Sequence, residues 1–148
     1  MKKALILGFG VSGLAAARLL QAQGWELVAV DRNPEGRSDI FRVVSESPMP
    51  SLAGIDLLVV SPGIPVNHPI IERAIELGIE WVGEIDLAFR SLRNHVVIGV
   101  TGSNGKTTAV SLIAHALYQS RSLGNIGAPL SEYALAPNER EILVVELS

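Results

Sequence analysis

Short apolar runs alternate with longer amphipathic stretches along the chain, and this alternation predicts strands that alternate with helices. The runs of strand length occupy residues 4–7, 26–30, 55–61, 79–82, 96–100 and 142–147, with a shorter candidate at 41–44. Segments with helical periodicity occupy residues 14–23, 68–77, 84–93, 106–119 and 130–135, and we expect a loop at 121–127. Because most strand candidates are apolar throughout, they are typical of strands buried on both faces, and the pattern predicts parallel sheets in an α/β fold.

The cycle of strand, glycine-rich loop and helix occurs twice, and Asn94 lies between the two occurrences. We therefore expect a Rossmann-like domain with a parallel sheet over residues 1–93. Residues 94–148 are expected to form the beginning of a P-loop ATPase domain of α/β type. The polar stretch at residues 32–54 is the least informative part of the chain.

Composition narrows the function classes. The 148 residues are 48% hydrophobic, carry a net charge of −3 and include no cysteine, which excludes a disordered chain, a disulfide scaffold and cysteine catalysis. The mild acidity argues against a nucleic-acid partner, which needs a basic face. No uncharged apolar stretch reaches the roughly 18 residues of a membrane span. We expect a cytoplasmic monomer that contacts no membrane.

The first candidate site is the segment Gly8–Gly13, a GxGxxG pattern between a strand and a helix. Its glycines let the backbone approach a diphosphate, and the start of the helix offers free N–H groups. Asp31 ends the second strand, where a carboxylate can accept hydrogen bonds from a ribose. NAD, FAD and a UDP-sugar all satisfy this pattern, and a tight turn that binds nothing is the remaining alternative.

The second candidate site is the segment Thr101–Thr108, again between a strand and a helix. It matches a phosphate-binding loop except that Val100 replaces the first glycine of GxxxxGK[ST]. Lys106 would neutralise the β- and γ-phosphates, and the Thr107 hydroxyl would reach Mg²⁺. This segment is the strongest mechanistic signal in the sequence.

Three weaker features lie at the ends of predicted strands. The segments Ser61–Pro65 and Gly124–Gly127 are either ligand-binding loops or simple turns. Glu146 could complete a Mg²⁺ shell, or be structural. The three histidines are scattered, and we interpret them as structural.

Both glycine loops together favour ATP chemistry on a substrate that itself carries a nucleotide. Two alternatives remain. One is a nicotinamide- or flavin-dependent oxidoreductase, which would leave Lys106 and Thr107 without a purpose. The other is a nucleotide-binding module without turnover.

The motifs occur in the order seen in the Mur ligases, and the chain resembles this family over its whole length. The residues that carry the resemblance are Gly8–Gly13, Ser61–Pro65 with His68 and Pro69, Gly83–Leu87, Gly102–Thr108, Gly124–Gly127 and Glu146–Ser148. The N-terminal glycine motif and the Ser61–Pro65 segment favour the members that add D-glutamate. Family members share the missing first glycine of the phosphate loop.

The resemblance implies an ATP-dependent amide ligase of peptidoglycan synthesis. ATP would phosphorylate the carboxylate of UDP-N-acetylmuramoyl-L-alanine, and the amine of D-glutamate would attack the acyl phosphate. The implied UDP-substrate contacts are Gly8, Gly10, Val11, Ser12, Gly13, Asp31, Arg32, Ser61, Pro62, Gly63 and Asn125. The implied ATP contacts are Gly102, Ser103, Asn104, Gly105, Lys106, Thr107 and Thr108. Lys106 would be catalytic, and Thr107 and Glu146 would bind Mg²⁺.

The chain also departs from the family. Relatives continue beyond this length into further metal-binding, adenine-binding and amino-acid-binding regions, so we expect that this chain alone does not ligate. The connection at Ser120–Leu123 is also several residues shorter than is usual before the Gly124–Gly127 segment.

Overall fold

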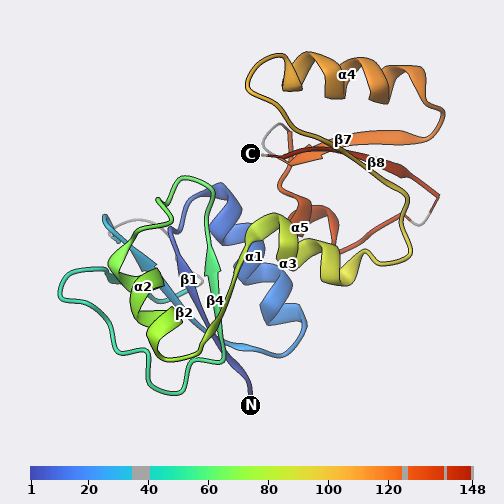
Figure 1. Ribbon diagram of the computed structural model, residues 1–148. Coiled ribbons are helices and arrows are strands. Elements are labelled where there is room, and N and C mark those ends of the chain that lie inside the picture. Colours follow the sequence, from blue (N-terminus) through green and yellow to red (C-terminus); the bar gives the residue numbers. More distant parts are fainter. Residues whose placement is uncertain (35–40, 125–126, 139, 148) are drawn as a thin grey trace.

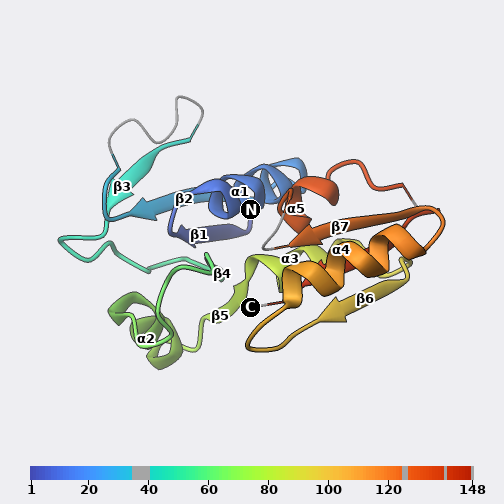
Figure 2. The same cartoon turned by 90° about the horizontal axis from the view of Figure 1, so that it is seen from above.

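The computed structural model describes residues 1–34, 41–124, 127–138 and 140–147 (Figure 1). Strands and helices follow one another along these residues, and Figures 1 and 2 label them. The strands are β1 (Lys3–Leu7), β2 (Glu26–Asp31), β3 (Val43–Ser45), β4 (Leu57–Val60), β5 (Glu80–Gly83), β6 (Val97–Val100), β7 (Ser120–Gly124) and β8 (Ile142–Glu146). The helices are α1 (Val11–Ala22), α2 (Pro69–Glu76), α3 (Glu84–Ser91), α4 (Lys106–Ala116) and α5 (Leu130–Tyr133).

Five strands form the first sheet, in the order β3-β2-β1-β4-β5, and every pair is parallel. The chain first moves outward from β1 to β3, then returns to the other side of β1 for β4 and β5. The order therefore reverses beside β1. In open parallel sheets the carboxyl ends of the strands on either side of such a reversal border the usual ligand crevice.

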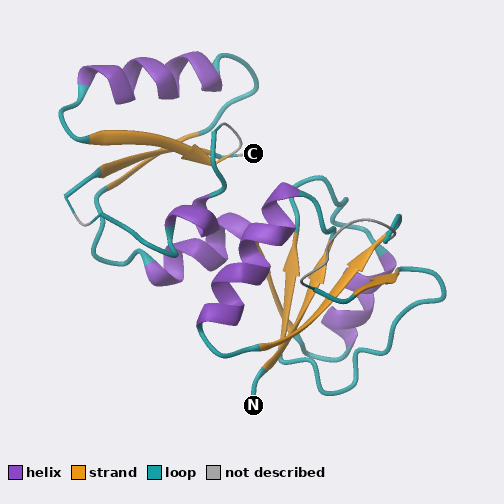
Figure 3. Ribbon diagram, turned by 180° about the vertical axis from the view of Figure 1, so that it is seen from behind, coloured by secondary structure: helices purple, strands orange, loops and turns teal. Residues whose placement is uncertain are grey.

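Both faces of the first sheet are buried, as the apolar runs predicted. Ala4 and Ile6 pack with residues of α1 and α3, whereas Leu5 and Leu7 pack with residues of α2. This two-residue alternation along β1 assigns α1 and α3 to one face of the sheet and α2 to the other (Figure 3).

The second sheet has the order β6-β8-β7 and is again parallel. Helix α4 lies on one side of it, and the short helix α5 lies on the other side, against α1 and α3 (Figure 1). Leu123, Leu130 and Leu143 belong to the same hydrophobic cluster as residues of α1 and α3. One continuous core therefore joins the two sheets.

The structure confirms the predicted α/β class with parallel sheets and most of the predicted elements. The predicted loop at 121–127 is wrong in its first part, because residues 120–124 form β7, which pairs with β8. Only Leu123 is buried in this edge strand, so its polar sequence has no apolar run that would reveal it. The predicted helix 106–119 is also too long: α4 ends at Ala116, and Gln119 turns the chain with φ of 52°. None of the helices within the described residues has the length and apolar character to cross a membrane.

Candidate functional site

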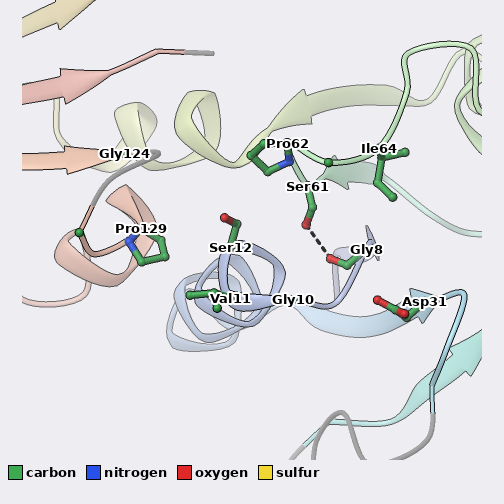
Figure 4. Close-up of a pocket in the computed structure, with 12 residues that line it drawn as sticks. Gly8, Gly10, Val11, Ser12, Asp31, Ser61, Pro62, Ile64, Gly124 and Pro129 are labelled. Atoms are coloured by element: carbon green, nitrogen blue, oxygen red, sulfur yellow. Dashed lines mark hydrogen bonds between the residues drawn. The ribbon is translucent and has the colours of Figure 1, made fainter. Parts of the chain in front are cut away.

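A cleft of about 750 Å³ opens at the carboxyl ends of β1, β2 and β4, where the strand order reverses (Figure 4). We call it the switch-point cleft. The glycine turn after β1, Asp31 after β2 and the loop Ser61–Ile64 after β4 line it from the first sheet. Gly124, Gly127 and Pro129 line it from the second sheet. The cleft is therefore lined by residues of both sheets.

The turn after β1 requires glycine for two separate reasons. Gly8 has φ of 85°, which side-chain-bearing residues rarely adopt. A Cβ on Gly13 would lie 2.1 Å from the carbonyl oxygen of Gly8, so helix α1 could not approach the turn. At Gly10, by contrast, an added Cβ would meet no atom within 4 Å. The predicted turn is thus confirmed as a close approach between strand and helix.

Helix α1 begins at Val11 with an uncapped N-terminus on the cleft. Its N-cap is Gly10, no side chain caps it, and its first turn contains no acidic residue. The first N–H groups of a helix have no partner within the helix, and the helix dipole adds partial positive charge there. Val11 and Ser12 line the cleft at this point. The geometry suits an anionic group such as a diphosphate.

Asp31 is buried at the edge of the cleft, with 8% of its surface exposed. Its Oδ2 accepts the N–H of Phe9 at 2.7 Å, and its Oδ1 accepts the N–H of Asn33 at 2.9 Å. The carboxylate is thus fixed against the glycine turn. Asp31 lies in the lining of the cleft, where a carboxylate can accept a hydrogen bond from a ligand hydroxyl.

Ser61 connects the loop after β4 to the same turn. Its Oγ donates a hydrogen bond of 2.6 Å to the carbonyl oxygen of Gly8 (Figure 4). Pro62 and Gly63 follow it along the wall of the cleft. The Ser61–Pro65 segment is therefore more than a turn, since it forms one side of the cleft and holds the opposite side in place.

A side cavity of about 310 Å³ continues the cleft past Asp31 toward Arg32 and Glu46. Arg32 Nε donates to Glu46 Oε1 at 2.9 Å, and His68 Nε2 lies 3.2 Å from Glu46 Oε2. Because His68 Nδ1 accepts the N–H of Ile70, the imidazole proton lies on Nε2 and is donated to Glu46. The hydrogen bond from Arg32 lowers the pKa of the Glu46 carboxyl. Sequence reasoning missed Glu46, which lies in the polar stretch without a motif.

The second candidate loop connects β6 to α4 and is exposed. Gly102 and Gly105 have φ of 144° and 74°, so both adopt conformations that favour glycine. Lys106 Nζ donates to the carbonyl oxygen of Gly102 at 2.7 Å and thereby folds over the loop. Helix α4 starts at Lys106 with neither a side-chain cap nor an acidic residue in its first turn. Ser103, Asn104 and Thr108 are exposed around this helix start.

Thr107 and Glu146 are in contact, although they are far apart in sequence. Strand β8 pairs with β6 so that Glu146 lies opposite Val100, just before the loop. The Thr107 hydroxyl donates to Glu146 Oε2 at 2.9 Å, and only 7% of Glu146 is exposed. A hydroxyl beside one carboxylate matches the oxygen donors of Mg²⁺ sites that phosphates and water complete. No group of three or more His, Cys, Asp or Glu residues suited to a metal occurs in the described part of the chain.

The predicted site residues fall into two groups, one on each sheet. The switch-point cleft and its side cavity collect the described UDP-substrate candidates except Gly13, which packs against the carbonyl oxygen of Gly8 and lines neither cavity. The loop after β6 and the end of β8 collect the predicted ATP and metal residues. Asn125 lies outside the described residues. Gly124 touches both groups. It lines the switch-point cleft, and it packs so closely against Glu146 that a Cβ on Gly124 would lie 2.6 Å from the Glu146 carbonyl oxygen.

The chain is similar to known proteins of one family. The family described as Mur ligase MurD-like, N-terminal domain, matches residues 2–83. A protein of Protochlamydia amoebophila is 44% identical over 161 residues, covering 99% of the chain and 36% of its own length. A protein of Trichormus variabilis is 41% identical over 163 residues, covering 100% of the chain and 36% of its own length. Both are named UDP-N-acetylmuramoylalanine–D-glutamate ligase.

The chain spans about a third of the length of these curated relatives. The alignments also extend over more positions than the 148 residues of the chain, so these relatives have residues in this region that the chain lacks.

Two solved structures share the fold. One is a murein peptide ligase of Psychrobacter arcticus, with a TM-score of 0.55 and 19% identity, covering 100% of the chain and 38% of that protein. The other is a pseudomurein peptide ligase type C of Methanothermus fervidus, with a TM-score of 0.54 and 22% identity, covering 99% of the chain and 33% of that protein.

Proposed function

The chain belongs to the Mur ligase family through its MurD-like N-terminal domain, and from this premise we propose that it is part of an ATP-dependent ligase. The ligase adds D-glutamate to UDP-N-acetylmuramoyl-L-alanine in peptidoglycan synthesis. Residues 1–93 form the UDP-substrate domain, and residues 94–148 form part of the ATP-binding domain. The names of the relatives that cover the whole chain support this substrate pair.

One observation carries the proposal. The switch-point cleft, which suits a diphosphate, and the loop after β6, which suits the phosphates of ATP, lie on adjoining sheets. In the cleft, the diphosphate of the UDP-substrate binds at the N–H groups of Val11 and Ser12. Asp31 accepts a hydrogen bond from the ribose. The base extends toward Arg32 in the side cavity, and the muramoyl group extends toward the second sheet.

On the second sheet, the backbone of residues 102–108 and the Lys106 ammonium hold the phosphates of ATP. The contact between Lys106 Nζ and Gly102 O shows that the ammonium already lies over the loop. Thr107 and Glu146 hold Mg²⁺, which supplies neutralisation of the phosphate charge when bound. Lys106 stabilises the negative charge of the γ-phosphoryl group while it transfers from ATP to the substrate carboxylate, with ADP leaving. The amine of D-glutamate then displaces phosphate from the acyl phosphate and forms the amide.

Separate titrations of the chain with UDP, UDP-N-acetylmuramoyl-L-alanine, NADH and Mg-ATP test the proposal. We expect binding of both UDP compounds and of Mg-ATP, and none of NADH. Lys106→Ala should lose Mg-ATP and keep UDP, because the two sites share no residue. Tight binding of NADH without any response to UDP compounds would contradict the proposal and favour an oxidoreductase. The proposed reaction takes place in the cytoplasm, where ATP is available.

A further inference from the structure

The segment 127–131 lies between β7 and the body of α5, in the part of the chain that borders both sheets. Its first residues border the switch-point cleft, where Gly127 and Pro129 lie in the same lining as Val11 and Ser12 (Figure 4). On the side of the second sheet, the N–H of Gly124 donates to the carbonyl oxygen of Ala128 at 3.3 Å. The far end of the segment enters α5, which packs against α1 and α3.

One carboxylate of the first sheet's domain holds that far end. Glu84 is the first residue of α3, only 3% of it is exposed, and its Oε1 accepts the N–H of Ser131 at 2.6 Å. The Ser131 hydroxyl also donates, to the backbone carbonyl oxygen of Glu84 at 3.3 Å, and Ser131 is fully buried. Ser131 thus donates twice to Glu84, and both bonds are buried between α3 and α5.

A buried carboxylate is costly unless it is hydrogen-bonded or paired, since burial disfavours the charged form. Burial does raise the pKa of Glu84, against the hydrogen bonds from Ser131. A second pair crosses between the same two parts of the chain, from Arg18 of α1 to Glu132 of α5 at 3.4 Å, but it is exposed on both sides. Screening by solvent makes such an exposed pair weak. Among the described residues, the hydrogen-bond partner of Glu84 is Ser131 and not a cation, so Glu84 contributes to this interface by hydrogen bonding to the start of α5.

We propose that Glu84 is a positioning residue: it holds the segment 127–131 against the cleft, so that a ligand seated at the start of α1 also contacts the second sheet. The inference rests on the proposed function, because it requires the segment 127–131 to contact the part of the UDP-substrate that extends beyond the diphosphate. Glu84 itself does not line the switch-point cleft. Its effect is exerted through Ser131 and Pro129.

The test compares calorimetric affinities of the 148-residue chain for UDP and for UDP-N-acetylmuramoyl-L-alanine. In Glu84→Ala we expect unchanged affinity for UDP, which needs only the first sheet. The affinity for the full substrate should fall about tenfold, the factor that one hydrogen bond to a charged group corresponds to. Glu84→Gln should restore the wild-type value, because its amide oxygen still accepts the Ser131 N–H. Glu132→Ala is the matched control on the same helix as Ser131 and should change neither affinity.

Equal losses for both ligands, no loss for either, or a Gln variant as weak as the Ala variant would each overturn the positioning role. If the wild-type chain binds neither UDP compound, the proposed function fails instead. If Glu84→Ala does not fold, the positioning role is tested instead by the hydrogen-exchange rate of the Ser131 amide in the wild-type chain. Slower exchange with the full substrate, but not with UDP alone, supports the role; the same exchange with both ligands contradicts it.

Discussion

The two candidate sites are built on the same plan, a strand, a glycine loop and an uncapped helix start, yet they are supported very differently. Around the cleft, side chains from the ends of β2 and β4 bond to the backbone of the turn after β1: Asp31 accepts the N–H of Phe9, and Ser61 donates to Gly8 O. The loop after β6 is exposed and is held by Lys106 on Gly102 and by Thr107 on Glu146.

The helices that follow the two glycine loops also differ in how deeply they are packed. Helix α1 has six buried residues, whereas Val110 is the one buried residue of α4. The cleft is thus preformed by a packed core, while the loop depends on a few polar contacts. We expect substitutions at the cleft to act through packing and substitutions at the loop to act through ligand binding.

The largest effect should come from Gly13→Val, which breaks the packing of the first site. Because even a Cβ would lie 2.1 Å from Gly8 O, α1 must move away from β1. We expect a loss of about 3 kcal/mol in the free energy of unfolding, measured by urea denaturation, at the upper end for overpacked cores. Gly10→Ala is the control, since open space surrounds that position, and its stability should stay close to that of the wild type. Equal stability of the two variants would show that the turn is not close-packed.

Thr107→Val tests the polar support of the second site at nearly constant shape. It leaves the largely buried Glu146 carboxylate without its hydroxyl partner, at a cost of about 1–3 kcal/mol in unfolding free energy. Binding of Mg-ATP should weaken strongly, while binding of UDP should not change. The exposed Ser111, which lies further along α4 and outside the phosphate loop, supplies the control as Ser111→Ala. Unaltered Mg-ATP affinity in Thr107→Val would remove this hydroxyl from the proposed metal site.

The buried carboxylate between the sheets should give a pH dependence of stability with a defined sign. Because the pKa of Glu84 is raised in the folded state, the folded chain binds more protons than the unfolded chain above the unfolded pKa. Its contribution to stability is therefore fully present below the unfolded pKa and is lost as pH rises through the folded pKa. Thermal unfolding of wild type and Glu84→Gln across this range should show that the variant gains stability relative to wild type with rising pH. A constant difference between the two proteins would contradict the raised pKa.

The contributions of Glu46, Glu80 and Glu141 to stability depend on pH in the opposite direction. Their arginine partners lower the pKa of each, so their contributions are lost as pH falls through the lowered values. This loss begins below the ordinary glutamate pKa, on the acid side of the window assigned to Glu84. Because wild type and Glu84→Gln both contain these three glutamates, their contributions cancel in the difference in stability between the two proteins.

The smallest effect should follow from Glu46→Ala in the side cavity. Arg32 would lose its carboxylate partner and sample more conformations, so we expect UDP affinity to fall about threefold, within the usual range for a solvent-exposed ion pair. Glu80→Ala removes a similar pair with Arg90 away from the cleft and should leave UDP affinity unchanged. Equal effects of the two substitutions on UDP binding would mean that Glu46 has no special relation to the site.

The sequence revealed those parts of the site whose chemistry is local. The Gly8–Gly13 and Thr101–Thr108 loops could be found because their glycines, lysine and threonine are neighbours in the chain, directly between a strand and a helix. Strand β7 could not be found, since its edge position requires little apolar sequence and its pairing with β8 is a long-range backbone interaction. Glu46 carries no motif either, because its partners are distant in the chain: Arg32 follows β2, and His68 is the N-cap of α2.

By itself, the sequence determined the α/β class, the two glycine turns and the family to which the chain belongs. These follow from periodicity and from residue types at fixed spacing, which short-range sterics and hydrogen bonding translate directly into conformation. Only the tertiary structure decided that Gly127 and Pro129 line the cleft and that the Thr107 hydroxyl bonds directly to Glu146. It also decided that Glu84 reaches Ser131. Those contacts depend on sheet register and on the docking of α5 against α1 and α3, which are set by the shared core and not by any adjacent residues.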